Sequence, residues 1–132
     1  MLKEVSIQNF AIIDELEVLF QPGLNIITGE TGAGKSILLG ALGLVLGERA
    51  DTNVLRNKEK KCVVEVLFDT STETQQWLEA QDIDQGTEIT LRREINSNGK
   101  SRAFINDTPA TLQQLKQLAA LLVDLHQQFD TL

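Results

Sequence analysis

One segment of eight residues constrains the fold of this chain more than any other feature. It reads GETGAGKS over residues 29–36 and fits the pattern G-x-x-x-x-G-K-[ST] at every required position. An apolar, strand-like stretch at residues 24–28 precedes it, and an apolar, helix-like stretch from Lys35 to Gly47 follows it. A strand, a glycine-rich loop and a helix in this order form the P-loop, which binds nucleotide phosphates. The sequence therefore predicts a nucleotide-phosphate site, and a glycine-rich helix entry with a surface lysine is the weaker alternative.

Each residue type in this motif has a physical role. Gly29, Gly32 and Gly34 permit backbone angles and a close approach that a side chain would block. Successive backbone N–H groups then form an anion-binding nest, to which the positive end of the helix adds. Lys35 supplies a positive charge for the β- and γ-phosphates, and Ser36 offers a hydroxyl ligand to Mg²⁺. The predicted nucleotide-binding residues of the motif are Gly29, Glu30, Thr31, Gly32, Ala33, Gly34, Lys35 and Ser36.

The composition is that of one ordinary globular domain. The chain has 132 residues, of which 42% are hydrophobic and 23% are charged, so a disordered tail and a collagen-like fibre are excluded. Cys62 is the only cysteine and His126 the only histidine, so we expect neither an internal disulfide nor a metal cluster. The longest apolar stretch, residues 37–46, is too short to span a bilayer, and no signal peptide is visible. We therefore expect a reduced, cytoplasmic protein that makes no contact with a membrane.

The distribution of charge bears on binding to nucleic acids. A net charge of −7 argues against strong DNA binding by this segment alone, because neutralising phosphates needs clustered lysine and arginine. One local basic run occupies residues 56–61. We interpret it as a solvated loop, with a DNA contact as the alternative. Farther along the chain, strand alternation puts Arg92 and Arg93 on opposite faces, so at most one of them can join a common basic surface.

The remaining pattern predicts a mixed α/β fold in which antiparallel hairpins flank the strand–P-loop–helix unit. Alternating or apolar residues predict strands at residues 5–7, 13–20, 24–28, 62–68, 88–95 and 101–106. Helices are expected at residues 35–47, at residues 72–80 and from Thr108 onward, and a short buried strand at residues 121–126. Gly40, Gly43 and Gly47 share one helix face, which we expect to lie close to a sheet.

The motif by itself leaves the type of P-loop protein open. A P-loop hydrolase needs a Walker-B acid for Mg²⁺ and a residue that orients water. Asp124 follows the apolar residues 119–123, but Leu125 stands where a second acid is expected. A partly buried acid at a strand end is an equally good interpretation of Asp124. A self-contained small P-loop kinase or NTPase and a non-catalytic P-loop module are therefore both compatible with these residues.

Four segments taken together are more specific than the P-loop motif. They read IQNFAII at residues 7–13, LNIITGETGAGKS at residues 24–36, ALGLVLGERA at residues 41–50 and SRAFIN at residues 101–106. In this combination the chain resembles, over essentially all of its 132 residues, the N-terminal head segment of the RecN family. That family belongs to the SMC-like, ABC-type ATPases, and its members act in bacterial DNA repair.

The resemblance implies half of an ATPase head. Such ATPases split one head across the two chain ends and join the halves by a long antiparallel coiled coil. Residues 1–132 would be the N-terminal lobe, with the coiled coil and the C-terminal lobe absent. The family's Walker-B acid, signature motif and catalytic glutamate lie in the C-terminal half. The resemblance therefore implies no catalytic residue in this segment and no Walker-B role for Asp124. ATPase activity is implied for the full-length protein and not for this segment alone.

The resemblance also implies further binding residues. Residues 125–128 read LHQQ and resemble the Q-loop, which in this family usually reads HGQH. The metal-contacting glutamine is therefore assigned to Gln128, with Gln127 as the alternative. Arg56 occupies the place where SMC-like heads have an arginine near the nucleotide and the DNA. ATP and Mg²⁺ are the implied cofactors.

The implied partners are the C-terminal lobe of the same protein, a second head in a homodimer, and DNA. The implied function is ATP-driven engagement of two heads in double-strand-break repair and recombination. The implied location is the cytoplasm, at the nucleoid when the protein acts on DNA. A head of another SMC-like repair ATPase is the alternative within the same class.

Overall fold

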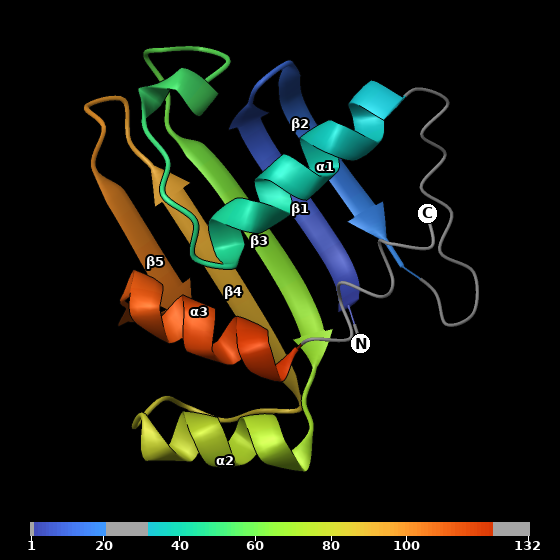
Figure 1. Cartoon of the computed structure of the whole chain (residues 1–132), viewed down its shortest axis with the longest axis vertical. Coiled ribbons are helices and arrows are strands. Elements are labelled where there is room, and N and C mark those ends of the chain that lie inside the picture. Colours follow the sequence, from blue (N-terminus) through green and yellow to red (C-terminus); the bar gives the residue numbers. More distant parts are fainter. Residues whose placement is uncertain (1, 21–31, 123–132) are drawn as a thin grey trace.

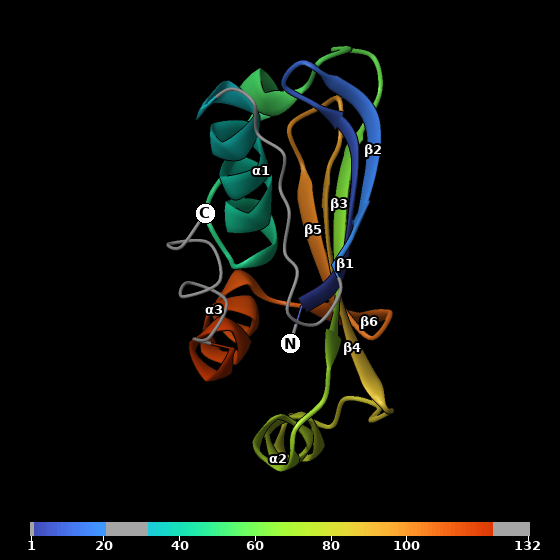
Figure 2. The ribbon, with the colours of Figure 1, turned by 90° about the vertical axis from the view of Figure 1, so that its right-hand side faces the viewer.

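The computed structural model describes residues 2–20 and 32–122, with side chains from Ser36 onward in the second range. Its strands form a six-stranded antiparallel sheet in the order β2-β1-β3-β4-β5-β6. Helices α1 and α3 lie on one face of this sheet, and α2 lies beyond one end of it (Figures 1 and 2). No helix within these two ranges is long and apolar enough to cross a membrane.

The first two strands form a hairpin, as the alternation predicts. Strand β1 spans Leu2–Phe10 and β2 spans Ile13–Leu19. Val5 and Ile7 of β1 are buried, while most of β2 is exposed because it forms one edge of the sheet. On its other side β1 pairs with β3, a strand that follows much later in the sequence. The predicted hairpin with one water-facing side is confirmed.

Strands β3 and β4 form the middle of the sheet. Strand β3 spans Cys62–Asp69 and β4 spans Glu88–Ile95, close to the predicted ranges. In both strands every second side chain is buried on the side of the helices. Arg93 is buried and its neighbour Arg92 is partly exposed, so the predicted separation of these two side chains onto opposite faces is confirmed.

Helix α2 connects the two central strands and matches its prediction. It spans Thr72–Ala80, and its N-terminus is closed by a capping box. The side chain of Ser71 accepts a hydrogen bond from the Thr74 N–H at 3.2 Å, and the Ser71 N–H donates to the Thr74 hydroxyl at 2.8 Å. Leu78 is fully buried and anchors the helix in the core.

The segment after the second hairpin differs from the prediction. Strand β5 spans Ser101–Ile105, and Thr108–Ala110 form a further strand, β6, instead of the start of a helix. Asn106 and Asp107 have positive φ angles of 49° and 64°, which fold the chain back in a tight hairpin. The predicted helix start at Thr108 is therefore wrong, because this turn returns the chain to the sheet.

Helix α3 follows β6. It spans Leu112–Leu121, and Thr111 caps it by accepting a hydrogen bond from the Gln114 N–H at 3.0 Å. Leu121 therefore ends a helix and does not begin the predicted strand at residues 121–126, of which residues 123–126 lie outside the described ranges.

Helix α1 spans Gly32–Val45 and crosses β3 and β4 (Figure 1). Leu38, Leu42 and Val45 are buried in the core. Burial of an aliphatic side chain of this size stabilises a fold by about 1.5–3 kcal/mol. The helix is therefore held to the sheet mainly by the apolar residues that the sequence places after the P-loop motif.

Helix α1 ends in a Schellman motif. The Glu48 N–H donates to the carbonyl of Gly43 at 3.0 Å, and the Gly47 N–H donates to the carbonyl of Leu44 at 3.3 Å. Gly47 has a φ angle of 103°, which residues with a Cβ rarely adopt. A glycine is needed at this position because it reverses the chain at the end of the helix.

The expectation that the helix glycines approach a sheet is wrong for Gly43 and Gly47. A Cβ at Gly43 would collide with the Glu48 carboxylate, and a Cβ at Gly47 would collide with α3. Only Gly40 has a neighbour from the sheet, since a Cβ there would lie 3.5 Å from the Phe10 ring, an ordinary van der Waals distance. The glycines of this face therefore serve the turn and the contact with α3 rather than close packing on strands.

Candidate nucleotide-phosphate site

The start of α1 carries the second half of the predicted phosphate-binding motif. The helix begins at Gly32, so the first backbone N–H groups of the helix have no partner within it. The first turn contains no acidic residue, and nothing in that turn offsets the partial positive charge of the helix N-terminus. Ser36 is exposed. Gly29, Glu30, Thr31 and the side chain of Lys35 lie outside the described residues.

These features fit a nucleotide with a magnesium ion. A helix N-terminus without an acid suits phosphate oxygens, and the Ser36 hydroxyl is an oxygen ligand of the kind that Mg²⁺ prefers. Within residues 2–20 and 32–122, no three His, Cys, Asp or Glu side chains are grouped so that they could hold a metal ion. Asp124, Gln127 and Gln128, which the sequence analysis considered for metal contact, lie outside these ranges.

A buried arginine contacts the opposite end of α1. Arg93 of β4 is only 1% exposed. Its Nη1 donates to the carbonyl oxygens of Leu44 at 2.8 Å and Glu48 at 2.6 Å, and its Nε donates to the Ser101 hydroxyl at 2.7 Å. Burial lowers the pKa of the Arg93 guanidinium. Burial also raises the pKa of the nearby Cys62 thiol to about 11, so this thiol is protonated and unreactive at neutral pH.

The basic run of residues 56–61 forms a loop at the end of the molecule where α1 begins. The residue before it, Leu55, forms an isolated β-bridge with Phe10. The loop and the short helix η1 (Thr52–Val54) lie at the same end as the β1–β2 turn and the start of α1 (Figures 1 and 2). Arg56 is exposed there. The structure thus places the loop of residues 56–61 and the start of α1 at one end of the molecule.

One buried asparagine, which the sequence analysis did not identify, holds this loop in shape. Asn9 is 5% exposed, and its Nδ2 donates to the carbonyl oxygens of Asn57 at 3.0 Å and Lys60 at 2.9 Å. Its Oδ1 accepts a hydrogen bond from the Asn57 N–H at 2.7 Å. Asn9 adopts a φ angle of 55°, a conformation that asparagine tolerates better than most residues. The loop backbone is therefore fixed, while its charged side chains at Arg56, Lys58 and Lys60 are exposed.

Arg92, on the open face of the sheet, does not extend this basic loop. Its guanidinium lies near three carboxylates, at 3.6 Å from Glu65, 3.2 Å from Glu94 and 3.1 Å from Asp107. It also stacks over the Phe104 ring, 4.3 Å from the ring centre. The positive charge of Arg92 is therefore matched within the sheet, and we exclude Arg92 from the candidate DNA contacts.

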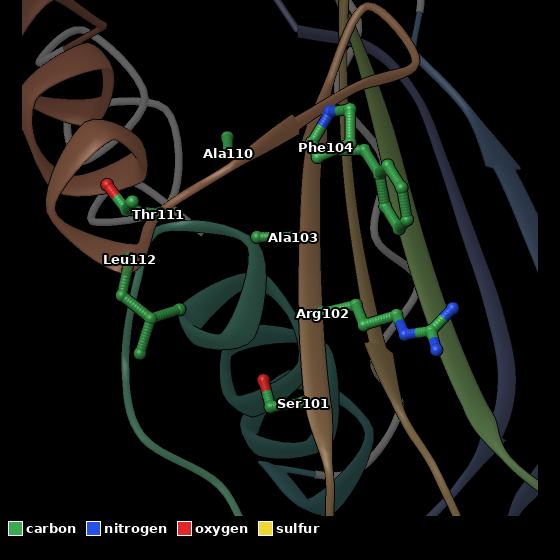
Figure 3. Close-up of a pocket in the computed structure, with 8 residues that line it drawn as sticks. Ser101, Arg102, Ala103, Phe104, Ala110, Thr111 and Leu112 are labelled. Carbon is green, nitrogen blue, oxygen red and sulfur yellow. The ribbon is translucent and has the colours of Figure 1, made fainter.

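A groove of about 520 Å³ lies at the sheet edge formed by β5 and β6, beside the start of α3 (Figure 3). Figure 3 shows Arg102 and Phe104 on one side of β5 and Ser101 on the side that faces α1. No residue from the start of α1 lines this groove. The groove is therefore separate from the candidate phosphate site.

Comparison with known protein families identifies the class of this chain. The family model described as an AAA domain matches residues 4–132. The chain belongs to the AAA domain family. The match includes the P-loop motif and, among the described residues, the sheet from Glu4 onward and helices α1, α2 and α3.

This AAA domain is similar to bacterial proteins named DNA repair protein RecN. It is 46% identical over 130 residues to RecN of Vibrio cholerae and 42% identical over 133 residues to RecN of Bacillus subtilis. These alignments cover 97% and 98% of the chain, but only 24% and 23% of the relatives. The chain therefore spans about a quarter of the length of these relatives. The family resemblance that four sequence segments indicated is confirmed.

Solved structures confirm the fold of this AAA domain. A structure from work on ATP-driven dimerization and DNA-stimulated activation of SMC ATPases matches with a TM-score of 0.69 and 20% identity, over 90% of this chain and 77% of that one. The recombination mediator protein RecF matches with a TM-score of 0.68 and 21% identity, over 87% of this chain and 29% of that one. An SMC head domain from Thermotoga maritima matches with a TM-score of 0.57 and 21% identity, over 88% of this chain and 41% of that one. The predicted fold class, a mixed α/β segment with the fold of these heads, is therefore correct.

Proposed function

We propose that this chain is the ATP-binding part of a DNA repair ATPase and that residues 29–36 bind the nucleotide phosphates. The observation that carries the proposal is the start of α1 inside the motif, with an exposed Ser36 and no acid in the first turn. Lys35 would contact the β- and γ-phosphates, and Ser36 would contact Mg²⁺, with Gln128 or its alternative Gln127 as a second ligand. Bound Mg²⁺ would neutralise phosphate charge at this site.

We infer that residues 1–132 form one lobe of a head whose other lobe lies elsewhere in the full-length protein. The chain spans about a quarter of its RecN relatives, which leaves room for a coiled coil and a second lobe. Part of α1 is also uncovered, since Leu39 is 40% exposed. A C-terminal lobe that covers this surface would bring the Walker-B acid and the catalytic glutamate to the phosphates. In this arrangement the chain supplies binding residues and no catalytic residue, so ATP hydrolysis needs the full-length protein.

We further infer that the ATP-bound heads form a homodimer and act on DNA in double-strand-break repair and recombination, in the cytoplasm and at the nucleoid. The names of the RecN relatives and the fold shared with SMC heads support this inference. We assign the DNA contact to the loop of residues 56–61. Its backbone is fixed by Asn9, and within the described residues neither Arg56 nor Lys60 forms an ion pair. Arg56 would lie between the nucleotide and the DNA.

The test of phosphate recognition is an equilibrium titration of the full-length protein with ATP and, as the comparator, with AMP, both in the presence of Mg²⁺. We expect ATP to bind at least about 100-fold more tightly, because two additional phosphates each gain a charge-assisted hydrogen bond worth about 1.5–3 kcal/mol. Equal affinities for the two nucleotides would contradict a site built on the β- and γ-phosphates.

A further inference from the structure

The charge of Arg93 has an unusual set of partners. The side chain is almost completely buried, yet within the described residues it forms no ion pair. Its hydrogen bonds go to the backbone carbonyls of Leu44 and Glu48 and to the hydroxyl of Ser101. Burying a charged side chain costs free energy unless polar groups surround it. The burial of Arg93 therefore depends on the position of the C-terminal end of α1. The negative end of the helix dipole is the counter-charge of Arg93.

These contacts fix the helix along its axis. The Leu44 carbonyl also accepts the hydrogen bond from Gly47, and the Glu48 carbonyl belongs to the residue that closes the Schellman motif. Arg93 therefore binds the last turn of α1 and the turn that follows it, while Ser101 on the next strand holds the guanidinium from the other side. Hydrogen bonds require defined distances and angles between donor and acceptor, so these contacts add a directional restraint to the apolar packing of the helix.

The far end of the same helix is the candidate phosphate site. Helix α1 has 14 residues and runs without a break from Gly32 to Val45, which is roughly 21 Å at about 1.5 Å per residue. A continuous helix of this length moves as one rod. A movement of the last turn of α1, which Arg93 contacts, therefore also displaces the first turn. The N–H groups of the first turn and Ser36 would contact the phosphates.

We propose that Arg93 is a positioning residue for nucleotide binding, which sets the place of the first turn of α1 by holding its last turn against β4 and β5. This inference rests on the proposed phosphate site. Arg93 does not touch the nucleotide, and its effect is transmitted through the helix. A purely structural arginine would stabilise the fold but would not alter the preference of the site for phosphate groups.

The test uses the full-length protein with Arg93→Gln, Arg93→Lys and Ser101→Ala. The readout is the ratio of the ATP affinity to the AMP affinity, because partial unfolding lowers both affinities alike and leaves their ratio unchanged. We expect Arg93→Gln to lower this ratio about 10-fold, the effect of losing one charge-assisted hydrogen bond to phosphate. Arg93→Lys should restore part of the ratio, since lysine keeps the charge but lacks the planar fork. Ser101→Ala should lower it less than Arg93→Gln does.

Two variants serve as matched controls. Arg92→Gln removes the same charge from the neighbouring position, which faces the other side of the sheet and contacts carboxylates instead of α1. Leu78→Ala weakens the core at α2. Neither should change the ratio, whatever it does to the free energy of unfolding measured in urea.

The outcomes separate the two claims. If the wild-type protein does not prefer ATP over AMP, the proposed phosphate site is wrong and this inference is overturned with it. If the wild-type protein prefers ATP and a folded Arg93→Gln variant keeps the wild-type ratio, only the positioning role of Arg93 is overturned. If Arg93→Gln does not fold, the ratio in Ser101→Ala decides, because that variant leaves the guanidinium and its two backbone contacts in place.

Discussion

Replacing Lys35 by alanine is expected to lower the rate of ATP hydrolysis by the full-length protein at least about 100-fold, because the site loses the charge that faces the β- and γ-phosphates. The loss should appear in both kcat and ATP affinity. The fold should persist, since alanine favours a helix and the lysine is expected to face phosphate rather than a buried acid. The measurement is steady-state phosphate release, together with urea unfolding of the same preparation.

Lys116→Ala is the matched control for this variant, because it removes a lysine from another helix, α3. Hydrolysis should be unchanged in this control. An unchanged rate in Lys35→Ala would contradict the assignment of the P-loop. A loss of activity caused only by unfolding requires that most of the variant be unfolded without denaturant, which the urea measurement detects.

Removing three lysines from the loop of residues 56–61 is expected to weaken DNA binding by the ATP-bound, full-length protein. The expected loss of affinity is roughly 100-fold or more at about 0.1 M salt, because each phosphate contact contributes a slope of about 0.9 in log affinity against log salt. The variant is Lys58→Ala, Lys60→Ala and Lys61→Ala combined. The weakening should be similar for all DNA sequences, because contacts to phosphates carry no sequence information. Affinity is measured at several salt concentrations.

The control for the loop variant removes three positive charges elsewhere, at Lys3, Arg92 and Lys116, and so changes the net charge by the same amount. Its affinity for DNA should stay within a small factor of the wild-type value. If the loop variant and the control bind alike and their salt slopes equal that of the wild type, residues 56–61 are a solvated loop and the DNA contact lies elsewhere.

Local patterns predicted much of the fold. Period-two alternation defined β3 and β4 and placed Arg93 on the buried face of its strand. The sequence also predicts the candidate phosphate site, because its residue types and spacing follow from the chemistry of phosphate and Mg²⁺. These features depend on residues that are close together in the sequence, so the sequence alone is enough to predict them.

The features that sequence missed depend on residues far apart in the chain or on backbone angles. Asn106 and Asp107 reverse the chain direction with two positive φ angles. Thr108–Ala110 therefore form strand β6, where the sequence predicted the start of a helix. Asn9 holds a loop about 50 residues away. Arg93 likewise forms hydrogen bonds with residues far away in the sequence, at the end of α1. The sequence shows only that a charged residue occupies a strand position whose side chain faces the core. That pattern indicates a buried polar contact but not its partner.

The most direct test of the phosphate site is a diffraction structure of the full-length protein grown with ATP and Mg²⁺. We predict electron density for the β- and γ-phosphates against residues 29–36 at the start of α1, with the Lys35 ammonium ion at the phosphates and the Ser36 hydroxyl on the metal ion. Density for the nucleotide at any other surface, with residues 29–36 free of phosphate, would contradict the account.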